Sequence, residues 1–149
     1  MKVNFYEAVD DHLLKFAVIL SKYQGKWVFC KHKERNTYEV PGGHREENES
    51  ILETAKRELY EETGALDFEM KPVCIYSVTG KNRENETVEE TFGALYYAEI
   101  KQLEKELHSE IEKICFFDEP PTEQTYPQIQ PLLMQEYIRR SALDNRGKV

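Results

Sequence analysis

The sequence predicts a single domain of the α+β class over residues 1–149, in which short strands flank one clearly delimited helix. Short apolar runs rich in β-branched and aromatic residues recur along the chain, as is typical of strands. The segment 50–64 carries both the start and the stop signals of a helix. No repeat, low-complexity segment or linker interrupts the 149 residues, a length that can bury a core of its own.

The first strands are predicted at residues 16–20 (FAVIL) and 26–32 (KWVFCKH). The segment between them contains Gly25, which suits a tight turn, so we expect these two strands to form a hairpin. A third strand is predicted at residues 36–40 (NTYEV) and ends before Pro41, because proline removes a backbone donor. A polar loop is expected to follow it as far as the helix.

The segment 50–64 is predicted to be the best-defined helix of the chain. Ser50 and Glu53 have the S-x-x-E spacing of a capping box, which satisfies backbone N–H groups at a helix start. Gly64 supplies the left-handed residue that commonly ends a helix. The apolar residues of the segment share one face on a helical projection and are expected to pack on the core: Ile51, Leu52, Ala55 and Leu59.

The second half of the chain predicts three more strands, at residues 73–78, 91–100 and 113–117, with a polar connecting loop at 80–87. A second helix is expected near the end of the chain, although Pro131 leaves its start open. Its apolar residues recur at helical spacing: Ile129, Leu132, Leu133 and Tyr137. The last six residues, DNRGKV, are expected to fray.

Charge and hydropathy exclude several classes of function. A formal net charge of −8 argues against a general affinity for a nucleic-acid polymer, which needs clustered Lys and Arg. The absence of an 18-residue apolar stretch and of a signal-like start argues against a membrane partner and predicts a cytoplasmic protein. Cys30, Cys74 and Cys115 are far apart and are expected to be free thiols.

Three glutamates break the rules of an ordinary helix at one place. Glu58, Glu61 and Glu62 lie in the last turns, where the helix dipole disfavours each negative charge by about 0.3–1 kcal/mol. Glu62 also falls within the apolar face. A hard divalent cation such as Mg²⁺ would offset both the unfavourable interaction with the helix dipole and the placement of a charge within the apolar face. The alternative is a surface helix stabilised by ion pairs of Arg57 with Glu53 and Glu61.

The surrounding residues resemble the signature of the Nudix hydrolase family, G-x5-E-x7-R-E-U-x-E-E-x-G-U, where U is a bulky aliphatic residue. Ala65, in the last place, departs from it. The resemblance covers a box at residues 43–65 and implies a mixed β-sheet sandwiched between helices. The positions that fit are Gly43, Glu49, Arg57, Glu58, Leu59, Glu61, Glu62 and Gly64.

The resemblance also implies the chemistry: hydrolysis of a nucleoside diphosphate linked to another group, with Mg²⁺ and sometimes Mn²⁺. It implies that Glu58, Glu61 and Glu62 hold the metal, with the backbone carbonyl of Gly43 as a further ligand. It implies that Glu49 and Arg57 tie the loop of the box to the helix, so that Arg57 supports the carboxylates.

Other site residues are open to two interpretations. The general base is expected to be Glu62, or else Glu90 or Glu89, which precede a predicted strand and otherwise belong to a solvated loop end. Arg45 is expected to contact a phosphate of the substrate or else to lie in a solvated loop. His12, His32 and His108 have no ligand spacing and are expected to be structural or exposed.

The substrate is inferred from what the chain lacks after the box. ADP-ribose hydrolases of the family usually carry a downstream proline where this chain has Gly80, Lys81 and Asn82. The tyrosine that dinucleoside polyphosphate hydrolases tend to have in roughly the same place is also missing, as is the proline-rich signature of the NADH hydrolases. The remaining MutT-like group converts nucleoside triphosphates, including 8-oxo-dGTP, to the monophosphate and pyrophosphate.

Three alternatives to this activity stay open. The first is a hydrolase of ADP-ribose or another nucleotide sugar, the second a regulatory Nudix domain that binds a nucleotide without turnover, and the third a structural or metal-buffering domain. In the first two the partner is a small-molecule nucleotide. The oligomeric state is not predicted.

Overall fold

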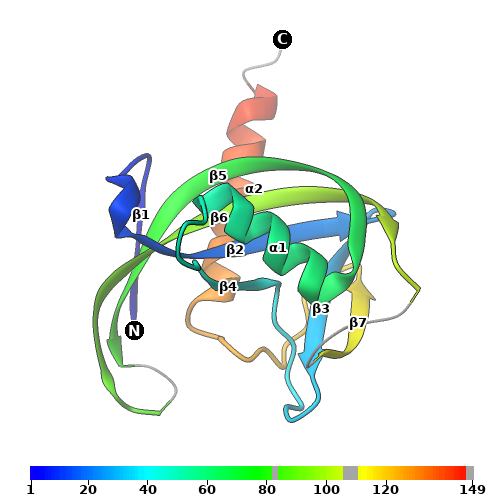
Figure 1. Cartoon of the computed structure of the whole chain (residues 1–149), viewed down its shortest axis with the longest axis horizontal. Coiled ribbons are helices and arrows are strands. Elements are labelled where there is room, and N and C mark those ends of the chain that lie inside the picture. The colour runs from blue at the N-terminus through cyan, green and yellow to red at the C-terminus, as the bar shows by residue number, and fades with distance from the viewer. Residues whose placement is uncertain (82–83, 106–110, 147–149) are drawn as a thin grey trace.

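In the computed structural model, which describes residues 1–81, 84–105 and 111–146, seven strands form one sheet and two α-helices pack against it (Figure 1). The helices are α1 (Ile51–Thr63) and α2 (Gln130–Arg146), and a short 3₁₀ helix, η1, covers Asp11–Leu13. The strands are β1 (Lys2–Tyr6), β2 (Leu14–Tyr23), β3 (Lys26–His32), β4 (Gly42–His44), β5 (Ala65–Lys81), β6 (Thr87–Leu103) and β7 (Ile111–Phe117).

The sheet is mixed, because β2 and β6 are parallel while the other pairs are antiparallel. The strand order is β1-β5-β6-β2-β3-β7, and β4 pairs with β2 beside this path. The longest pairing joins β5 and β6, two strands of 17 residues each that form a hairpin.

β2 and β3 separate soon after their turn, and another part of the chain enters between them. The two strands pair only through Lys22 with Trp27 and Tyr23 with Lys26. Further along, β4 pairs with β2, and the backbones of Cys30 on β3 and Glu39 exchange hydrogen bonds of 2.7 and 3.0 Å. Residues 38–44 therefore run through the gap between β2 and β3.

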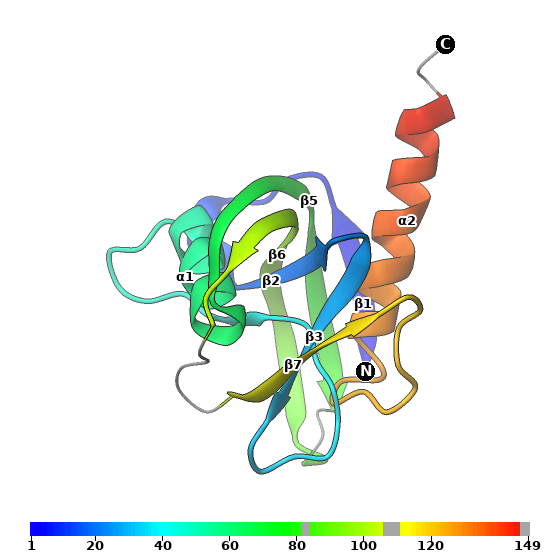
Figure 2. The same cartoon turned by 90° about the vertical axis from the view of Figure 1, so that its right-hand side faces the viewer.

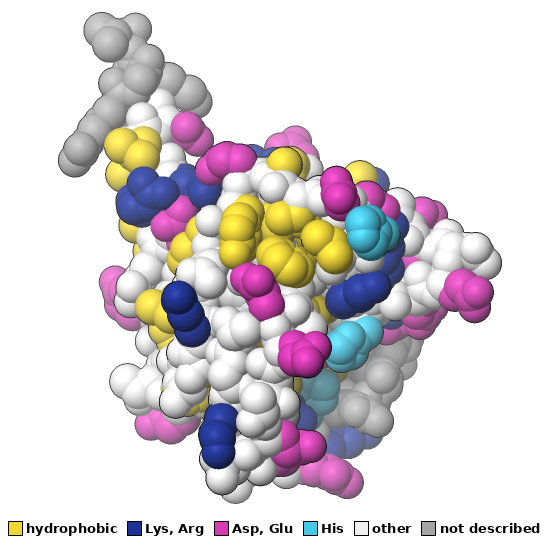
Figure 3. All heavy atoms as spheres, turned by 90° about the vertical axis from the view of Figure 1, so that its left-hand side faces the viewer, with side chains coloured by type: hydrophobic (Ala, Val, Ile, Leu, Met, Phe, Trp, Pro, Cys, Tyr) yellow, Lys and Arg dark blue, Asp and Glu magenta, His cyan; other side chains and the backbone are white. Residues whose placement is uncertain are grey.

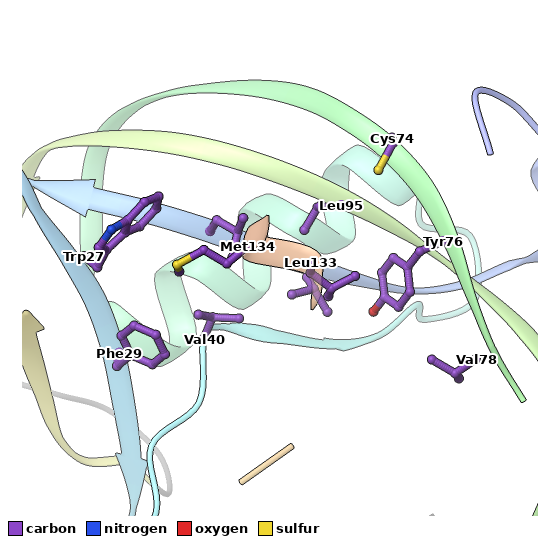
Figure 4. Packing of buried hydrophobic residues seen from close by; sticks show 11 residues of the cluster. Trp27, Phe29, Val40, Cys74, Tyr76, Val78, Leu95, Leu133 and Met134 are labelled. Carbon is purple, nitrogen blue, oxygen red and sulfur yellow. The ribbon is translucent and has the colours of Figure 1, made fainter. Parts of the chain in front are cut away.

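The sheet lies between the two helices, as the predicted sandwich requires (Figure 2). Alternate residues of β2 point to opposite sides, as expected for a strand buried on both faces. Ala17 and Ile19 pack on the α1 side, whereas Val18 and Leu20 pack on the α2 side. Figure 4 shows the α2-side core, to which α2 contributes Leu133 and Met134. The predicted α+β class is confirmed.

α1 begins and ends where the sequence predicts. The Ser50 Oγ accepts a hydrogen bond from the Glu53 N–H at 3.1 Å, and Glu53 Oε1 accepts one from the Ser50 N–H at 2.9 Å. Gly64 has a φ of 75°, and its N–H donates to the Tyr60 carbonyl. Ala55 and Leu59 are fully buried, but Leu52 is 40% exposed because the helix reaches past the edge of the core at this position.

α2 begins at Gln130 and places Pro131 in its first turn, where a missing N–H group costs no helical hydrogen bond. Tyr137 stacks on Tyr97 of β6, with ring centroids 4.7 Å apart. The helix continues to Arg146, so the predicted fraying from Asp144 is wrong at its start, and residues 147–149 lie outside the described part. No helix in the described part is long and apolar enough to cross a membrane.

Three other predictions are corrected. Residues 36–40 form no strand, since Tyr38 and Glu39 make only isolated bridges, and the strand of this region is β4, where a loop was expected. The loop predicted at 80–87 is shortened, because β5 reaches Lys81 and β6 begins at Thr87; residues 82–83 lie outside the described part. β1, whose alternating Val3 and Phe5 pack on the α2-side core, was not predicted.

Candidate active site

The predicted contact between Glu49 and Arg57 is present and has two hydrogen bonds. Arg57 Nε donates to Glu49 Oε2 at 2.7 Å, and Arg57 Nη2 donates to Glu49 Oε1 at 3.1 Å. The hydroxyl of Thr54 and the N–H of Glu46 donate to the same Oε1. These donors, Arg57 first, lower the pKa of Glu49 to about 2, so its carboxylate is ionised at neutral pH.

Arg57 also connects this loop to β4 and to the next carboxylates along α1. Its Nη2 donates to the backbone carbonyl of His44 at 3.0 Å, and its Nη1 donates to Glu58 at 2.8 Å and Glu61 at 3.3 Å. The hydrogen bond to Glu49 is the main reason that the pKa of Arg57 is raised. One permanent positive charge therefore hydrogen-bonds three carboxylates, those of Glu49, Glu58 and Glu61, and lies 3.7 Å from a fourth, that of Glu46.

Glu62 lies within the apolar face of α1 and is 9% exposed, as its position in the helix predicts. The N–H of Gly42 donates to its Oε1 at 2.7 Å. Burial raises the pKa of Glu62 to about 8; the Gly42 N–H acts in the opposite direction, and the nearby Glu58 adds to the effect of burial. A cation beside this side chain would favour its ionised form.

Glu58 packs directly against Gly43 of β4. A Cβ atom built on Gly43 would overlap the carboxylate of Glu58, so only glycine leaves room for this side chain. The Glu58 side chain is 13% exposed, and its pKa is raised by burial against the opposing effect of Arg57. Glu61, on the outer face of α1, has a side chain that is 47% exposed.

The donor set suits a hard divalent cation. Glu58, Glu61, Glu62 and the Gly43 carbonyl are all oxygen donors, the type that Mg²⁺ prefers. Within the described residues no group of three His, Cys, Asp or Glu side chains is drawn together closely enough to hold an ion. Glu58 and Glu61 instead accept hydrogen bonds from Arg57, and Glu62 accepts one from the Gly42 N–H. Metal binding by these carboxylates therefore stays a prediction.

Arg45 is already occupied by contacts within the protein. Its Nε donates to the Glu49 carbonyl at 2.7 Å, Nη1 to the Asp11 carbonyl at 3.0 Å, and Nη2 to Asp11 Oδ2 at 2.9 Å. These bonds fasten the loop of the box to η1. A phosphate contact of Arg45 stays a prediction and would require some of these bonds to open.

Glu90 lies at the start of β6, next to β1 and β5. Its Oε2 accepts hydrogen bonds from the Ser77 hydroxyl at 2.7 Å and the Tyr6 hydroxyl at 2.8 Å, and these donors lower its pKa. Glu89 is exposed beside it. On the face drawn in Figure 3, hydrophobic side chains gather with histidine, basic and acidic side chains around them. Whether Glu89 or Glu90 serves as a base stays a prediction.

Comparison with known proteins decides the family. The family model for the NUDIX domain matches residues 11–133, which is most of the chain. The chain belongs to the NUDIX domain family. The resemblance found in residues 43–65, which form the Nudix box, is therefore confirmed at the level of the family.

Individual relatives agree with this assignment. The chain is 38% identical over 92 residues to a Bacillus subtilis (strain 168) protein named "Putative 8-oxo-dGTP diphosphatase YtkD". This match covers 62% of the chain and 54% of YtkD, so the chain spans about half the length of this relative.

Solved Nudix structures have the same fold. The pyrophosphohydrolase BsRppH of Bacillus subtilis, in a mutant form, aligns with a TM-score of 0.74 at 24% identity over 93% of this chain and 90% of that one. The NUDIX domain of Shewanella oneidensis NrtR, complexed with ADP ribose, aligns with a TM-score of 0.66 at 13% identity over 85% and 87%. At these identities the likeness shows the fold alone.

His32, which lies outside the Nudix box, also contacts the side chain of Glu62, and Glu39 contacts His32; neither contact was predicted from the sequence. His32 Nε2 lies 3.3 Å from Glu62 Oε2, although this histidine was expected to be structural or exposed. The same nitrogen lies 3.5 Å from Glu39 Oε2, and Glu39 is 7% exposed. Glu39 meets His32 because residues 38–44 run beside β3. This is a tertiary contact, which no local sequence pattern predicts. His108 lies outside the described residues.

Proposed function

We propose that this Nudix protein is a Mg²⁺-dependent hydrolase that cleaves a nucleoside triphosphate, ordinary or oxidised, into the nucleoside monophosphate and pyrophosphate. The observation that carries the proposal is the arrangement of Glu58, Glu61 and Glu62 at the end of α1, held by Arg57 and Gly42. Membership of the NUDIX family supports hydrolysis, and the likeness to YtkD supports a triphosphate such as 8-oxo-dGTP.

In this proposal Glu58, Glu61, Glu62 and the carbonyl of Gly43 hold Mg²⁺, and Mn²⁺ can replace it. When bound, the metal neutralises phosphate charge and lowers the pKa of water. Arg57 orients Glu58 and Glu61 through hydrogen bonds and is itself fixed by two bonds to Glu49. This fixed geometry reduces the entropy cost of aligning the reacting groups.

The reaction breaks the anhydride bond between the α and β phosphates. Water forms the new P–O bond, one carboxylate accepts the proton of that water, and pyrophosphate leaves. Glu62 is the first candidate for the proton acceptor, because burial raises its pKa and makes its carboxylate a stronger base than an exposed one. Glu90 is the second candidate and the weaker base, because Ser77 and Tyr6 lower its pKa.

A hollow on the α2 side of residues 38–44 supports a nucleoside as part of the substrate. It has a volume of about 160 Å³ and is walled by apolar side chains that include Phe29, Val40 and Met134. Within the described residues, Gln124 Oε1 in its wall is buried and has no hydrogen-bond partner. Apolar walls and a buried amide oxygen without a partner among the described residues suit a nucleobase that carries an N–H group.

The test is a panel of substrates incubated with Mg²⁺: 8-oxo-dGTP, the ordinary nucleoside triphosphates, ADP-ribose and diadenosine polyphosphates. Chromatography of the products is expected to reveal a monophosphate and pyrophosphate from a triphosphate, with loss of turnover in Glu62→Gln. Turnover of ADP-ribose alone would replace the substrate proposed here. Saturable binding of nucleotide and Mg²⁺ without any turnover would instead favour a regulatory Nudix domain.

A further inference from the structure

His32 stands between two buried carboxylates at the end of β3. Its Nε2 lies 3.3 Å from Glu62 Oε2 and 3.5 Å from Glu39 Oε2. The two glutamates are 9% and 7% exposed, whereas the His32 side chain is 22% exposed. One imidazole nitrogen therefore contacts both a carboxylate from α1 and a carboxylate from residues 38–44.

The chemistry of the contact determines where the hydrogen is. A neutral imidazole has a hydrogen on one nitrogen and a lone pair on the other, and a protonated ring has a hydrogen on both. When both carboxylates are ionised, as metal binding by Glu62 requires, a lone pair at Nε2 would face the oxygens of Glu39 and Glu62 and be repelled by both. In that state Nε2 carries a hydrogen in either form of the ring.

Glu62 is thus held at both oxygens by different parts of the chain. Gly42 N–H donates to Oε1 at 2.7 Å, and His32 Nε2 faces Oε2. The Sγ of Cys30, two residues before His32, donates to the backbone carbonyl of Glu62 at 3.3 Å. The rotamer of Glu62 is therefore fixed by β3 and β4 as well as by α1.

Glu39 is held in turn by Arg35, whose Nη1 donates to Glu39 Oε1 at 2.9 Å. The backbone of Glu39 is paired with Cys30 on β3. Positive or hydrogen-bond donor groups alternate with carboxylates along a row of four side chains: Arg35, Glu39, His32 and Glu62. A row of this kind fixes each member more firmly than a single contact would.

We propose that His32 is a positioning residue of the active site, which acts through Glu62 by holding Oε2 with its Nε2–H, while Glu39, itself held by Arg35, fixes the imidazole. The inference rests on the proposed role of Glu62 at the metal. Each carboxylate oxygen has two lone pairs, so Oε2 can face His32 and still bind a cation. Loss of a partner that orients a metal ligand typically costs about 10–100-fold in metal affinity or activity.

The experiment compares two polar replacements that differ in reach. The amide nitrogen of His32→Gln can occupy the place of Nε2, whereas that of His32→Asn ends near the place of Nδ1 and stops short of Glu62. His12→Asn, at an exposed histidine of η1, is the matched control. Mn²⁺ affinity is measured without substrate from the electron paramagnetic resonance signal of the free ion, and kcat and KM are measured with Mg²⁺ and the triphosphate that the wild type hydrolyses best.

We expect His32→Asn to bind Mn²⁺ about tenfold more weakly and to lower kcat about 10–100-fold with little change in KM. His32→Gln and His12→Asn are expected to stay close to the wild type in both measurements. Circular dichroism spectra identify any variant that does not fold. Equal losses in the Gln and Asn variants, or no loss in either, would overturn the proposal.

A double-variant experiment tests whether His32 acts through Glu62. In a Glu62→Gln background, a further change of His32 to Asn is expected to leave Mn²⁺ affinity unchanged, because the residue that it positions is already altered. An additive loss would mean that His32 acts elsewhere. A wild-type protein that neither binds Mn²⁺ nor turns over would instead contradict the proposed function, whereas a normal His32→Asn variant contradicts only this inference.

Discussion

Arg57 and Glu49 face each other across the loop of the Nudix box with two hydrogen bonds of 2.7 and 3.1 Å. A guanidinium and a carboxylate match in this geometry, which a lysine does not reproduce. Because the same guanidinium also reaches Glu58, Glu61 and the His44 carbonyl, one side chain fixes the loop, the helix and β4 together.

Replacing Arg57 by lysine should therefore reduce activity more than the retained charge suggests. We expect kcat to fall about 10–100-fold, because the carboxylates of α1 lose their orientation, while the protein stays folded. Steady-state kinetics with circular dichroism check both parts. Arg139→Lys, which removes the two bonds of an exposed guanidinium to Glu136 on α2, is the control and should leave kcat unchanged. A normal kcat in Arg57→Lys would contradict this account of the loop.

Acid should remove the contribution of Glu49 to stability. Its pKa in the folded protein is about 2, below the ordinary value of 4.5, so the folded state favours the ionised carboxylate. The stabilisation is complete above pH 4.5 and disappears as the pH falls towards 2. Urea unfolding from pH 2 to 6 should show that Glu49→Gln is less stable than the wild type near pH 6 and equal to it near pH 2. A constant difference would argue against the ion pair as its source.

Glu62 should have the opposite effect when no metal is present. Its pKa is about 8 in the folded protein against an ordinary 4.5, so the folded state binds the proton more tightly. The free energy of unfolding should then decrease as the pH rises from 4.5 to 8. In EDTA at pH 9, Glu62→Gln should melt at a higher temperature than the wild type, and Mg²⁺ should reduce this difference. A lower Tm of the variant throughout this pH range would contradict the burial argument.

A methyl group at Gly43 should disturb Glu58 directly. The added Cβ would overlap the carboxylate, so Gly43→Ala is expected to turn the Glu58 side chain away and lower kcat at least about tenfold. Gly25→Ala is the control, because Gly25 has a φ of 81° and, among the described residues other than its two neighbours along the chain, no atom lies within 4 Å of an added Cβ. The control should lose about 1 kcal/mol of stability through its backbone and keep its kcat. Equal kcat values in the two variants would refute the steric explanation.

The amide of Gln124 should affect substrate choice. Its Oε1 is buried in the α2-side hollow and has no partner among the described residues, but its Nε2 donates to the Pro121 carbonyl, so Gln124→Leu is expected to cost no more than about 1 kcal/mol of stability, the worth of that one hydrogen bond. If a base binds there, KM should rise about tenfold for nucleotides whose base offers an N–H group, a loss typical of one hydrogen bond. KM values for the triphosphate panel provide the measurement, and unchanged values for all bases would place the nucleoside elsewhere.

Local signals predicted the part of the site that lies on α1. The capping residues, the left-handed Gly64 and the burial of Glu62 follow from helix geometry, so spacing alone placed Glu62 correctly within the apolar face. The resemblance to the Nudix signature then paired Glu49 with Arg57, which the structure confirms as a contact.

The parts that the sequence did not predict depend on contacts between distant segments. Residues 36–40 have the composition of a strand, yet their neighbours in the gap between β2 and β3 allow only isolated bridges. His32 meets Glu39 and Glu62 because β3, α1 and residues 38–44 converge, and none of these segments carries a signal for the others. β1 pairs with the distant β5, a contact that its own composition does not signal.

The passage of residues 38–44 between β2 and β3 also limits the length of the turn that precedes it. Val40 faces the α2-side core, whereas its neighbour Glu39 faces His32 on the other side. Deleting one residue from the turn at 33–37 would shift this segment by one position and exchange the two faces. A carboxylate would then enter the apolar core and a valine would stand beside Glu62, so insertions and deletions that are neutral in other surface turns would be selected against here.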